Sequence, residues 1–377
     1  MPPLVLGGAG RIALELARAS IAAGHEACMV TAASPGKLPS SVDGVPCCAV
    51  EPVAPLAAHY RSVMDPWRAA AVARLVLSQR PDVVHAHTVA WHIGYGWMPI
   101  VARAGVPIVF TAHDAMTVAY GKVSAHEAHP VWRDMRRVRI AWNPLRNALV
   151  RHALRSCTLR IAVSDALAQY LRGRGIPMDR TIHNGIDTSF WKPMPGKAAR
   201  DAIGVPHHAR VFLLAGRLGH DKGVAATLAV LPPDALLLLA GEAYGQGAGD
   251  ARVRVLGPLD AEGMRSAYAA ADAVLVPSVY LDPFPTVCLE AMACGKPVIA
   301  TCHGGAREAV RDGRDGWVVD PLDEPAFHKR LAWCMTRDEE LKQAGESGRA
   351  HACEAFGLSG FSSVMLETYA SLSAGAV

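Results

Sequence analysis

The stretch of sequence that decides the fold runs from residue 277 to residue 301 and reads PSVYLDPFPTVCLEAMACGKPVIAT. It follows an apolar run that predicts a strand, and a turn carrying Asp282 comes next. A helix is expected to begin near Pro285, because proline in the first turn loses no intrahelical hydrogen bond. The helix is expected to stop at Gly295, a favourable residue at a helix C-terminus. With the apolar run that follows, the stretch predicts a strand–helix–strand unit of a parallel sheet.

The same alternation of short apolar runs and longer helical stretches fills the chain. The runs are Cys28–Ala32, Val83–His87, Ile108–His113, Arg160–Ser164, Val211–Gly216, Leu236–Gly241, Val253–Gly257, Ala273–Ser278, Val298–Thr301 and Trp317–Asp320. Near-continuous apolar runs between helices indicate parallel strands buried on both faces. We therefore predict an α/β protein with two doubly wound, Rossmann-like domains, residues 1–190 and 191–355, that face each other across a cleft. In the C-terminal segment, residues 356–377, a last helix is expected to cross back to the first domain.

Composition and charge narrow the class of protein. The 377 residues are 51% hydrophobic and 19% charged, which is typical of a globular chain with more than one domain. Nine scattered cysteines without zinc-type spacing favour reduced thiols in the cytoplasm. No apolar run is long enough to span a membrane and no signal peptide is evident, so we expect a cytoplasmic protein. The net charge of +4 without a recognised motif gives no indication of nucleic-acid binding.

Two acidic residues lie close to the start of the helix predicted after residue 285. Ligands of open α/β sheets bind at the carboxyl ends of the strands, where free backbone N–H groups at a helix N-terminus favour a phosphate. Asp282 lies before this helix and Glu290 inside it, so their carboxylates can meet hydroxyl groups on both sides of a diphosphate. A nucleotide sugar carries such hydroxyls on its hexose and its ribose. An isolated glutamate is more often a solvated surface residue, but the apolar neighbours of Glu290 favour burial.

This segment resembles the signature of two acids, seven residues apart, of the large retaining GT-B family known as glycosyltransferase family four. The match continues through the Glu-Ala-Met-Ala-Cys-Gly motif to the Pro-Val-Ile-Ala motif. The resemblance implies a sugar contact for Asp282 and donor contacts for Phe284, Thr286, Val287 and Glu290. The sequence departs from the family at Asp282, where a glutamate is usual. The carboxylate is kept but its side chain is shorter, which is expected to affect which hexose is bound.

The segment from Gly216 to Gly223 is similar to the Arg…Lys pair with which the family grips the donor diphosphate. Arg217 and Lys222 would stabilise the negative charge that develops on the leaving nucleoside diphosphate. Without that resemblance, two cations in a loop would be interpreted as solvated charges. No Asp-x-Asp metal motif is present, since Asp312 and Asp315 have the wrong spacing. We therefore expect no metal and no other cofactor, the nucleotide sugar being a co-substrate.

In the first half of the chain the resemblance extends to His113, at a position where a histidine at a strand end lies beside the reacting sugar. A lone strand-end histidine is more often a core residue, and His85 and His87 are interpreted as packing residues. Gly8 lies in a run similar to the glycine loop of the family near the donor phosphate. The segment 303–308 resembles a Gly-Gly-x-x-Glu turn, whose glycines let the backbone approach the donor.

Two features depart from the family pattern. Family members usually begin with a strand before the glycine loop, whereas this sequence begins inside that loop, so the first strand of the N-terminal domain is expected to be missing. We hypothesise a start codon placed too late.

The segment from Trp132 to Arg155 holds seven arginines, two tryptophans and one aspartate. It predicts either a solvated helix pair or, from Arg133 to Arg155, a surface that contacts an anionic membrane carrying a polyprenyl-linked acceptor.

Together these features predict a retaining, metal-independent glycosyltransferase with His113, Asp282, Arg217 and Lys222 as catalytic residues. It would move a hexose from a UDP- or GDP-sugar to a glycan or lipid-linked acceptor in surface or exopolysaccharide assembly, working in the cytoplasm or at the inner face of the membrane. Two alternatives stay open: a non-catalytic protein that binds nucleotide sugars, and a phosphorylase or epimerase with the same fold.

Overall fold

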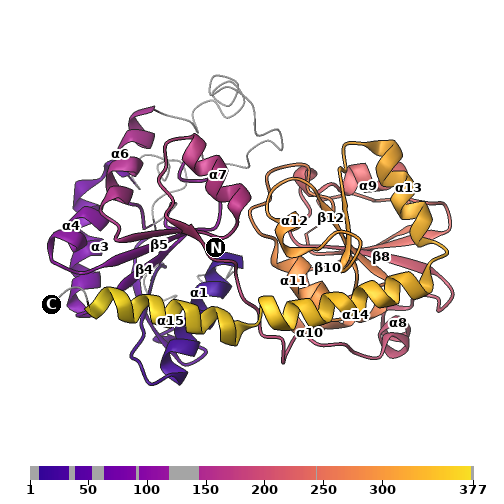
Figure 1. Ribbon diagram of the computed structural model, residues 1–377, viewed down its shortest axis with the longest axis horizontal. Coiled ribbons are helices and arrows are strands. Elements are labelled where there is room, and N and C mark those ends of the chain that lie inside the picture. Colours follow the sequence, from indigo (N-terminus) through magenta and orange to yellow (C-terminus); the bar gives the residue numbers. More distant parts are fainter. Residues whose placement is uncertain are drawn as a thin grey trace. The chain divides into compact units, whose positions relative to one another are not determined.

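The computed structural model describes residues 8–33, 39–52, 63–90, 93–118, 144–242 and 244–374. These residues form two compact units (Figure 1). Unit 1 contains the residues up to Gly185 together with those from Leu358 onward, and unit 2 contains Ile186–Gly357. Residues 1–7, the start of the sequence where the first strand of the N-terminal domain is expected to be missing, and the basic residues 132–143 lie outside the described residues.

Unit 1 contains two sheets with helices around them. Its elements are α1 (Gly8–Ala22), β1 (Met29–Ala32), β2 (Ser41–Val42), β3 (Val45–Val50), α3 (Pro66–Ser78), β4 (Val84–His87), α4 (Met98–Arg103), β5 (Ile108–Ala112), α6 (Pro144–Arg155), β6 (Leu159–Ala162), α7 (Asp165–Gly173), β7 (Arg180–Thr181) and α15 (Leu358–Ala374). One sheet has the order β1-β3-β2 and the other has the order β4-β5-β6-β7. The four strands of the second sheet are all parallel, so their carboxyl ends lie at one edge.

The first and the last helix of unit 1 pack together on the second sheet. Leu16 of α1 and Met365 of α15 form a buried cluster with Val109 of β5 and Ile161 of β6. Figure 1 shows α15 as the yellow helix beside α1 and β4. The C-terminal helix is therefore part of the core of unit 1, although it follows unit 2 in the sequence.

Unit 2 is a doubly wound α/β domain. Its elements are α8 (Gly196–Ile203), β8 (Arg210–Ala215), the short 3₁₀ helix η2 (His220–Lys222), α9 (Val224–Val230), β9 (Ala235–Ala240), β10 (Val253–Gly257), α10 (Ala261–Ala270), β11 (Ala273–Val276), α11 (Thr286–Ala293), β12 (Val298–Thr301), α12 (Ala306–Ala309), β13 (Gly316–Val319), α13 (Glu324–Cys334) and α14 (Asp338–Ala355). The sheet is parallel, in the order β10-β9-β8-β11-β12-β13. The order reverses between β8 and β11, which makes the carboxyl ends of these two strands the expected ligand site.

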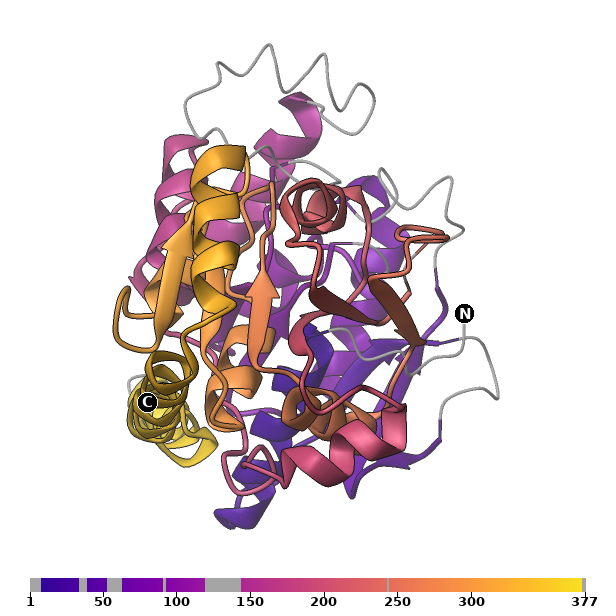
Figure 2. The same ribbon diagram turned by 90° about the vertical axis from the view of Figure 1, so that its right-hand side faces the viewer.

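The inner strands β9, β11 and β12 of unit 2 are almost entirely apolar because both faces of the sheet are covered there (Figures 1 and 2), whereas the edge strand β10 carries the exposed Arg254. Phe212 and Leu214 of β8 join a cluster with α9, α13 and α14, which includes Val224 and Phe327. The intervening residue Leu213 is also fully buried, and α10 contacts the sheet at β8 and β9. Burial on both faces holds the sheet rigid behind the loops that carry the candidate site.

The predicted fold class is confirmed, since both units contain parallel sheets with α-helices between the strands. Each of the ten predicted apolar runs contains a strand. The sequence did not predict β2, β3 and β7; of these β2 and β7 have only two residues, and β3 carries Pro46 and half-exposed positions. Among the described residues, no helix combines the length and the hydropathy that crossing a membrane requires.

Candidate active site

The candidate site of unit 2 lies where the strand order of its sheet reverses. Strands β8 and β11 are adjacent, with Leu214 opposite Leu275. The loops that follow the two strands are joined by a hydrogen bond of 2.9 Å from Val279 N to Asp221 O. The sheet topology thus brings together two loops that are about sixty residues apart in the sequence.

Asp282 and Lys222 form an ion pair between these loops. Lys222 Nζ lies 2.6 Å from Asp282 Oδ2, and the buried Ser278 donates its hydroxyl hydrogen to the same oxygen over 2.7 Å. The other carboxylate oxygen, Oδ1, accepts no hydrogen bond from the described residues. The side chain of Asp282 is 6% exposed, so the loops largely enclose its carboxylate. One oxygen is therefore fixed by two protein groups, and the other has no protein donor among the described residues.

The charge on Lys222 is stabilised by its surroundings. Burial lowers the pKa of Lys222, but the charge and hydrogen bond of Asp282, together with Tyr280, outweigh burial and raise this pKa above its ordinary value. The ammonium group also lies 5.1 Å from the ring centre of Tyr280, in a cation–π contact. Burial raises the pKa of Tyr280, so this side chain stays a neutral phenol. The site therefore presents a permanent positive charge at neutral pH.

The turn after β12 contacts the backbone of Asp282. Gly305 N donates to Asp282 O over 2.8 Å. Gly304 has a φ of +83°, and a Cβ atom there would lie 2.2 Å from Asp282 O, so no other residue fits at this position. The glycines of the predicted Gly-Gly turn thus permit a close backbone approach, and in the structure the group approached is Asp282.

The other donor-binding residues predicted in this segment lie in helix α11 or just before it. Thr286 and Val287 begin the helix and are half-buried, whereas the ring of Phe284 is buried and packs edge-on against Phe356 at 5.8 Å. A donor contact by Phe284 would therefore use its backbone. Glu290 Oε2 accepts a hydrogen bond of 2.8 Å from the buried hydroxyl of Tyr268.

Arg217 differs from Lys222 in its environment. Arg217 is exposed and forms no ion pair within the part of the chain that the structure describes. It lies near Tyr244, whose hydroxyl donates to Glu242. The structure thus brings Lys222 and Asp282 together, and it places Arg217 in the loop that starts directly after β8, open to solvent.

In unit 1 the strand-end histidines take part in two separate sets of hydrogen bonds. His87 Nδ1 lies 2.9 Å from His113 Nε2, so one of these two nitrogens carries the hydrogen that both share. His85 bridges Thr111, at 2.7 Å, and Tyr369 of α15, at 2.5 Å. Burial lowers the pKa of His87 to about 4 and, with the charge of His87, holds the pKa of His113 well below its usual range. The imidazoles are therefore neutral near pH 7.

His87 and His113 border a cavity of about 10 Å³, which is also lined by Ile12, Thr111 and Asn184, among others. This volume approaches the space that a single water molecule needs. Gly8, expected in a glycine loop, is the first residue of helix α1; it is exposed, and no atom lies within 4 Å of the position of a Cβ atom there. The structure therefore shows no close contact that would require glycine at this position.

One residue of the basic segment is not on the surface. Arg146 is only 1% exposed, and its guanidinium donates to the carbonyl oxygens of Met116 and Thr117 and to Asn147 Oδ1. The expectation that Arg146 contributes to a membrane-facing surface is therefore wrong, because its charge is used inside unit 1. Arg155 is exposed and Arg151 is half-buried.

Sequence reasoning missed several partners of the predicted residues. Ser278 and Tyr280 support the Lys222–Asp282 pair, and Tyr268 holds Glu290. Ser278 could have been found, because it ends the same apolar run that precedes Asp282. The pairing of Tyr268 with Glu290 has no signal in the sequence, since it joins two different helices.

Two Rossmann-like units in one chain are the architecture of the GT-B class of glycosyltransferases. The sequence profile described as Glycosyltransferase Family 4 matches residues 6–190, and that of Glycosyl transferases group 1 matches residues 197–351. Glycogen synthase of Mycobacterium tuberculosis is 31% identical over 381 residues, which cover 88% of this chain and 86% of that protein. The chain therefore belongs to this family of glycosyltransferases.

Another relative and two solved structures are consistent with this family assignment. D-inositol 3-phosphate glycosyltransferase 2 of Catenulispora acidiphila is 29% identical and covers 96% of this chain, which spans 90% of its length. Sucrose-phosphate synthase from Thermosynechococcus elongatus superposes with a TM-score of 0.80 at 23% identity, covering 98% and 94% of the two chains. HepE of Anabaena in complex with UDP-glucose gives a TM-score of 0.72 at 23% identity, covering 97% and 96%. At this identity the two structures show the shared fold.

Proposed function

We propose that the protein is a retaining, metal-independent hexosyltransferase that uses a nucleoside-diphosphate sugar, UDP- or GDP-linked, as its donor. The observation that carries the proposal is the carboxylate of Asp282, with Oδ2 held by Lys222 and Ser278 and Oδ1 without a protein donor among the described residues. A hexose hydroxyl is a suitable donor to that oxygen. The solved complex of HepE with UDP-glucose, a protein of the same fold, supports this class of donor.

In the proposed mechanism, Lys222 and Arg217 contact the diphosphate of the donor. The acceptor hydroxyl attacks the anomeric carbon from the face on which the diphosphate leaves. A carbon–oxygen bond forms to the acceptor, the bond to the phosphate oxygen breaks, and that phosphate oxygen takes the proton of the acceptor. The permanent charge on Lys222 lowers the barrier because it stabilises the negative charge of the leaving group. Glu290 is assigned to the ribose and His113 to the transferred sugar.

The acceptor is proposed to be a glycan or a lipid-linked saccharide of a surface or exopolysaccharide pathway. One relative is named a glycogen synthase and another an inositol 3-phosphate glycosyltransferase. Both names indicate acceptors with many hydroxyl groups, which supports transfer to a polyhydroxylated acceptor. The proposal that the segment up to Arg155 contacts an anionic membrane now relies on Arg155, Arg151 and the residues outside the described ranges. Flotation with anionic and neutral vesicles tests it, and equal recovery with both would contradict it.

The experiment that tests the function measures binding and slow hydrolysis of UDP-, GDP- and ADP-sugars, each with and without a chelator. We expect one donor to be hydrolysed at a rate that the chelator does not change. The anomeric configuration of the glycoside formed with a simple acceptor, read by NMR, should match that of the donor. Inversion would contradict the retaining mechanism, and loss of turnover with the chelator would contradict metal independence. Donor binding without any turnover would favour a non-catalytic role.

A further inference from the structure

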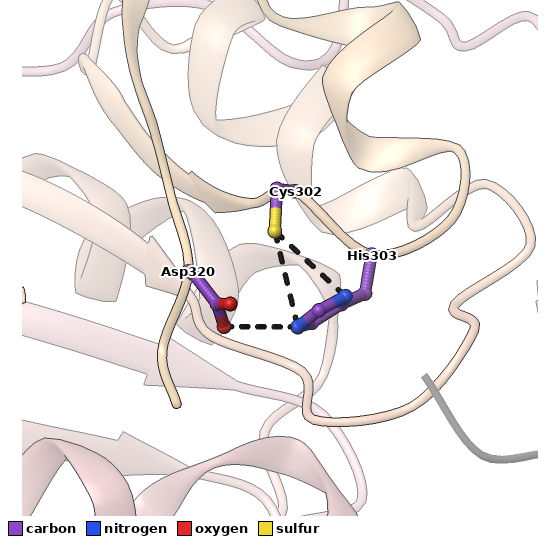
Figure 3. Close-up of side chains that lie close together, drawn as sticks. All are labelled: Cys302, His303 and Asp320. Atoms are coloured by element: carbon purple, nitrogen blue, oxygen red, sulfur yellow. Dashed lines mark hydrogen bonds and ion pairs between the residues drawn. The ribbon is translucent and has the colours of Figure 1, made fainter. Parts of the chain in front are cut away.

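Three side chains of unit 2 meet at the carboxyl ends of β12 and β13, apart from the Lys222–Asp282 pair. They are Cys302, His303 and Asp320 (Figure 3). Figure 3 shows the thiol above the imidazole ring and the carboxylate beside one ring nitrogen. His303 Nε2 lies 3.0 Å from Asp320 Oδ1, and Cys302 Sγ lies 3.7 Å and 3.8 Å from the two ring nitrogens. All the ligand atoms lie within 4.8 Å of one another.

The backbone fixes the positions from which these side chains project. Strands β12 and β13 are parallel neighbours, with Thr301 opposite Val319. Cys302 N donates to Val319 O over 2.8 Å. Residues 302 and 320 therefore lie side by side, each directly after the last paired residue of its strand. His303 N donates to Thr301 Oγ1 over 3.1 Å, which fixes the turn at the third position. The three groups are therefore held by the ends of a buried sheet.

We propose that Cys302, His303 and Asp320 bind a divalent zinc ion. A thiolate, an imidazole and a carboxylate form a ligand set that zinc prefers over hard cations such as Mg²⁺ and Ca²⁺. Tetrahedral zinc, with bonds of about 2.0–2.3 Å, requires its donor atoms to be about 3.3–3.6 Å apart. Two of the three separations, 3.0 Å and 3.8 Å, lie on either side of that range, and the third, from Cys302 Sγ to the carboxylate of Asp320, is within 4.8 Å. With three protein ligands, a water molecule takes the fourth position.

Small side-chain movements suffice to close the site around the ion. The imidazole turns about its Cβ–Cγ bond, so that the lone pair of Nε2 points toward the thiol and the carboxylate. The ring hydrogen then resides on Nδ1, and Cys302 loses its thiol proton to solvent. The ion can enter from outside, because the side chain of Asp320 is 43% exposed, while that of His303 is only 12% exposed and steadies the site.

The alternative to a metal site is a structural hydrogen bond between His303 and Asp320 that orients the turn, with the thiol of Cys302 nearby by chance. In that case no metal binds at stoichiometric concentration. The distinction matters because the turn continues into Gly304 and Gly305, which contact the backbone of Asp282. A bound ion would steady this turn but is not needed to form it, because the backbone contacts of Gly304 and Gly305 with Asp282 are present without it, and it would take no part in the transfer step.

The test is a titration of the full chain with Zn²⁺ in competition with a chromophoric chelator, in the absence of any sugar nucleotide. The thiols of Cys28 and Cys48 are 3.8 Å apart and can also bind zinc, so a background with Cys28→Ser and Cys48→Ser is used throughout. We expect one ion per chain. Cys302→Ser and His303→Gln should each weaken the affinity at least about tenfold, a loss reported even for residues that only support a ligand. Cys353→Ser, which removes an exposed cysteine elsewhere, should leave it unchanged.

Substitution of Co²⁺ gives an independent readout. A thiolate-to-cobalt absorption band together with strong tetrahedral d–d bands should appear, and the thiolate band should disappear in Cys302→Ser. Circular dichroism of the metal-free variants checks that they are folded; if one is not, Asp320→Asn, at an exposed carboxylate, replaces it. Absence of stoichiometric binding, or an affinity unchanged in a folded ligand variant, would overturn the proposal. Because no donor is present, this result is independent of the proposed transferase function.

Discussion

Lys222 Nζ and Asp282 Oδ2 are 2.6 Å apart, and their side chains are 20% and 6% exposed. The two residues come from loops after adjacent strands of one sheet. A charged pair this deeply buried is costly to disrupt on one side only, because the remaining charge has no partner and little water. It therefore links the stability of unit 2 to the proposed donor site.

The first prediction concerns that pair. Lys222→Met and Asp282→Asn should each lower donor turnover by about 10²–10³-fold, since each removes a group that would act on the leaving diphosphate or the sugar. Each should also lower the free energy of unfolding, by up to about 3 kcal/mol. The double variant should lose less stability than the sum of the two, because no unpaired charge is left. Denaturant unfolding of the four proteins checks this, and additive losses would contradict a coupled pair.

The second prediction concerns the buried Arg146. Arg146→Met should destabilise unit 1 by about 2–4 kcal/mol, because the carbonyl groups of Met116 and Thr117 lose their donor inside the protein. Arg155→Met, at an exposed position of the same helix, is the matched control and should change stability by less than about 0.5 kcal/mol. Thermal unfolding of both variants measures the effect, and equal losses would show that burial of Arg146 is unimportant.

The third prediction is a loss of stability in mild acid. The pKa of His87 is about 4 in the folded protein, below its ordinary value of 6.5, so between these pH values the unfolded chain binds a proton that the folded chain does not. The stabilisation is complete above pH 6.5 and declines as the pH falls toward 4, by about 3 kcal/mol from this residue. His87→Gln should flatten the dependence, measured as the unfolding midpoint from pH 7 to pH 4.5. An unchanged slope would contradict the burial of a neutral His87.

The fourth prediction concerns the C-terminal helix. Met365→Ala should destabilise unit 1 by about 2–5 kcal/mol, since it opens a cavity against Leu16, Val109 and Ile161. Val364→Ala, one residue earlier, removes a side chain that is 43% exposed and should cost much less. Hydrogen exchange at β5 and β6 should accelerate in Met365→Ala. If both variants behave alike, the helix does not pack as described.

The sequence predicted the strands well because buried parallel strands are apolar without interruption, as in Val298–Thr301. It also placed Lys222 and Asp282 near a common ligand, through a family resemblance, but it did not predict their direct contact. Such contacts depend on strand order, which periodicity does not encode. Arg146 was misinterpreted for a related reason: in a run of arginines nothing local marks the one whose guanidinium finds backbone carbonyls. Cys302 and Asp320 meet only through the register of two strands that are separated by a helix and a turn.

The place of α15 in the core of unit 1 has a consequence for biosynthesis. The described part of unit 2 is one continuous stretch, Ile186–Gly357, and the contacts within it are available once that stretch has left the ribosome. Unit 1 is made first, yet Leu16, Val109 and Ile161 acquire their partner Met365 only after unit 2 has been synthesised. We expect the nascent unit 1 to expose an apolar surface while unit 2 is being synthesised, and to depend on chaperones during that interval.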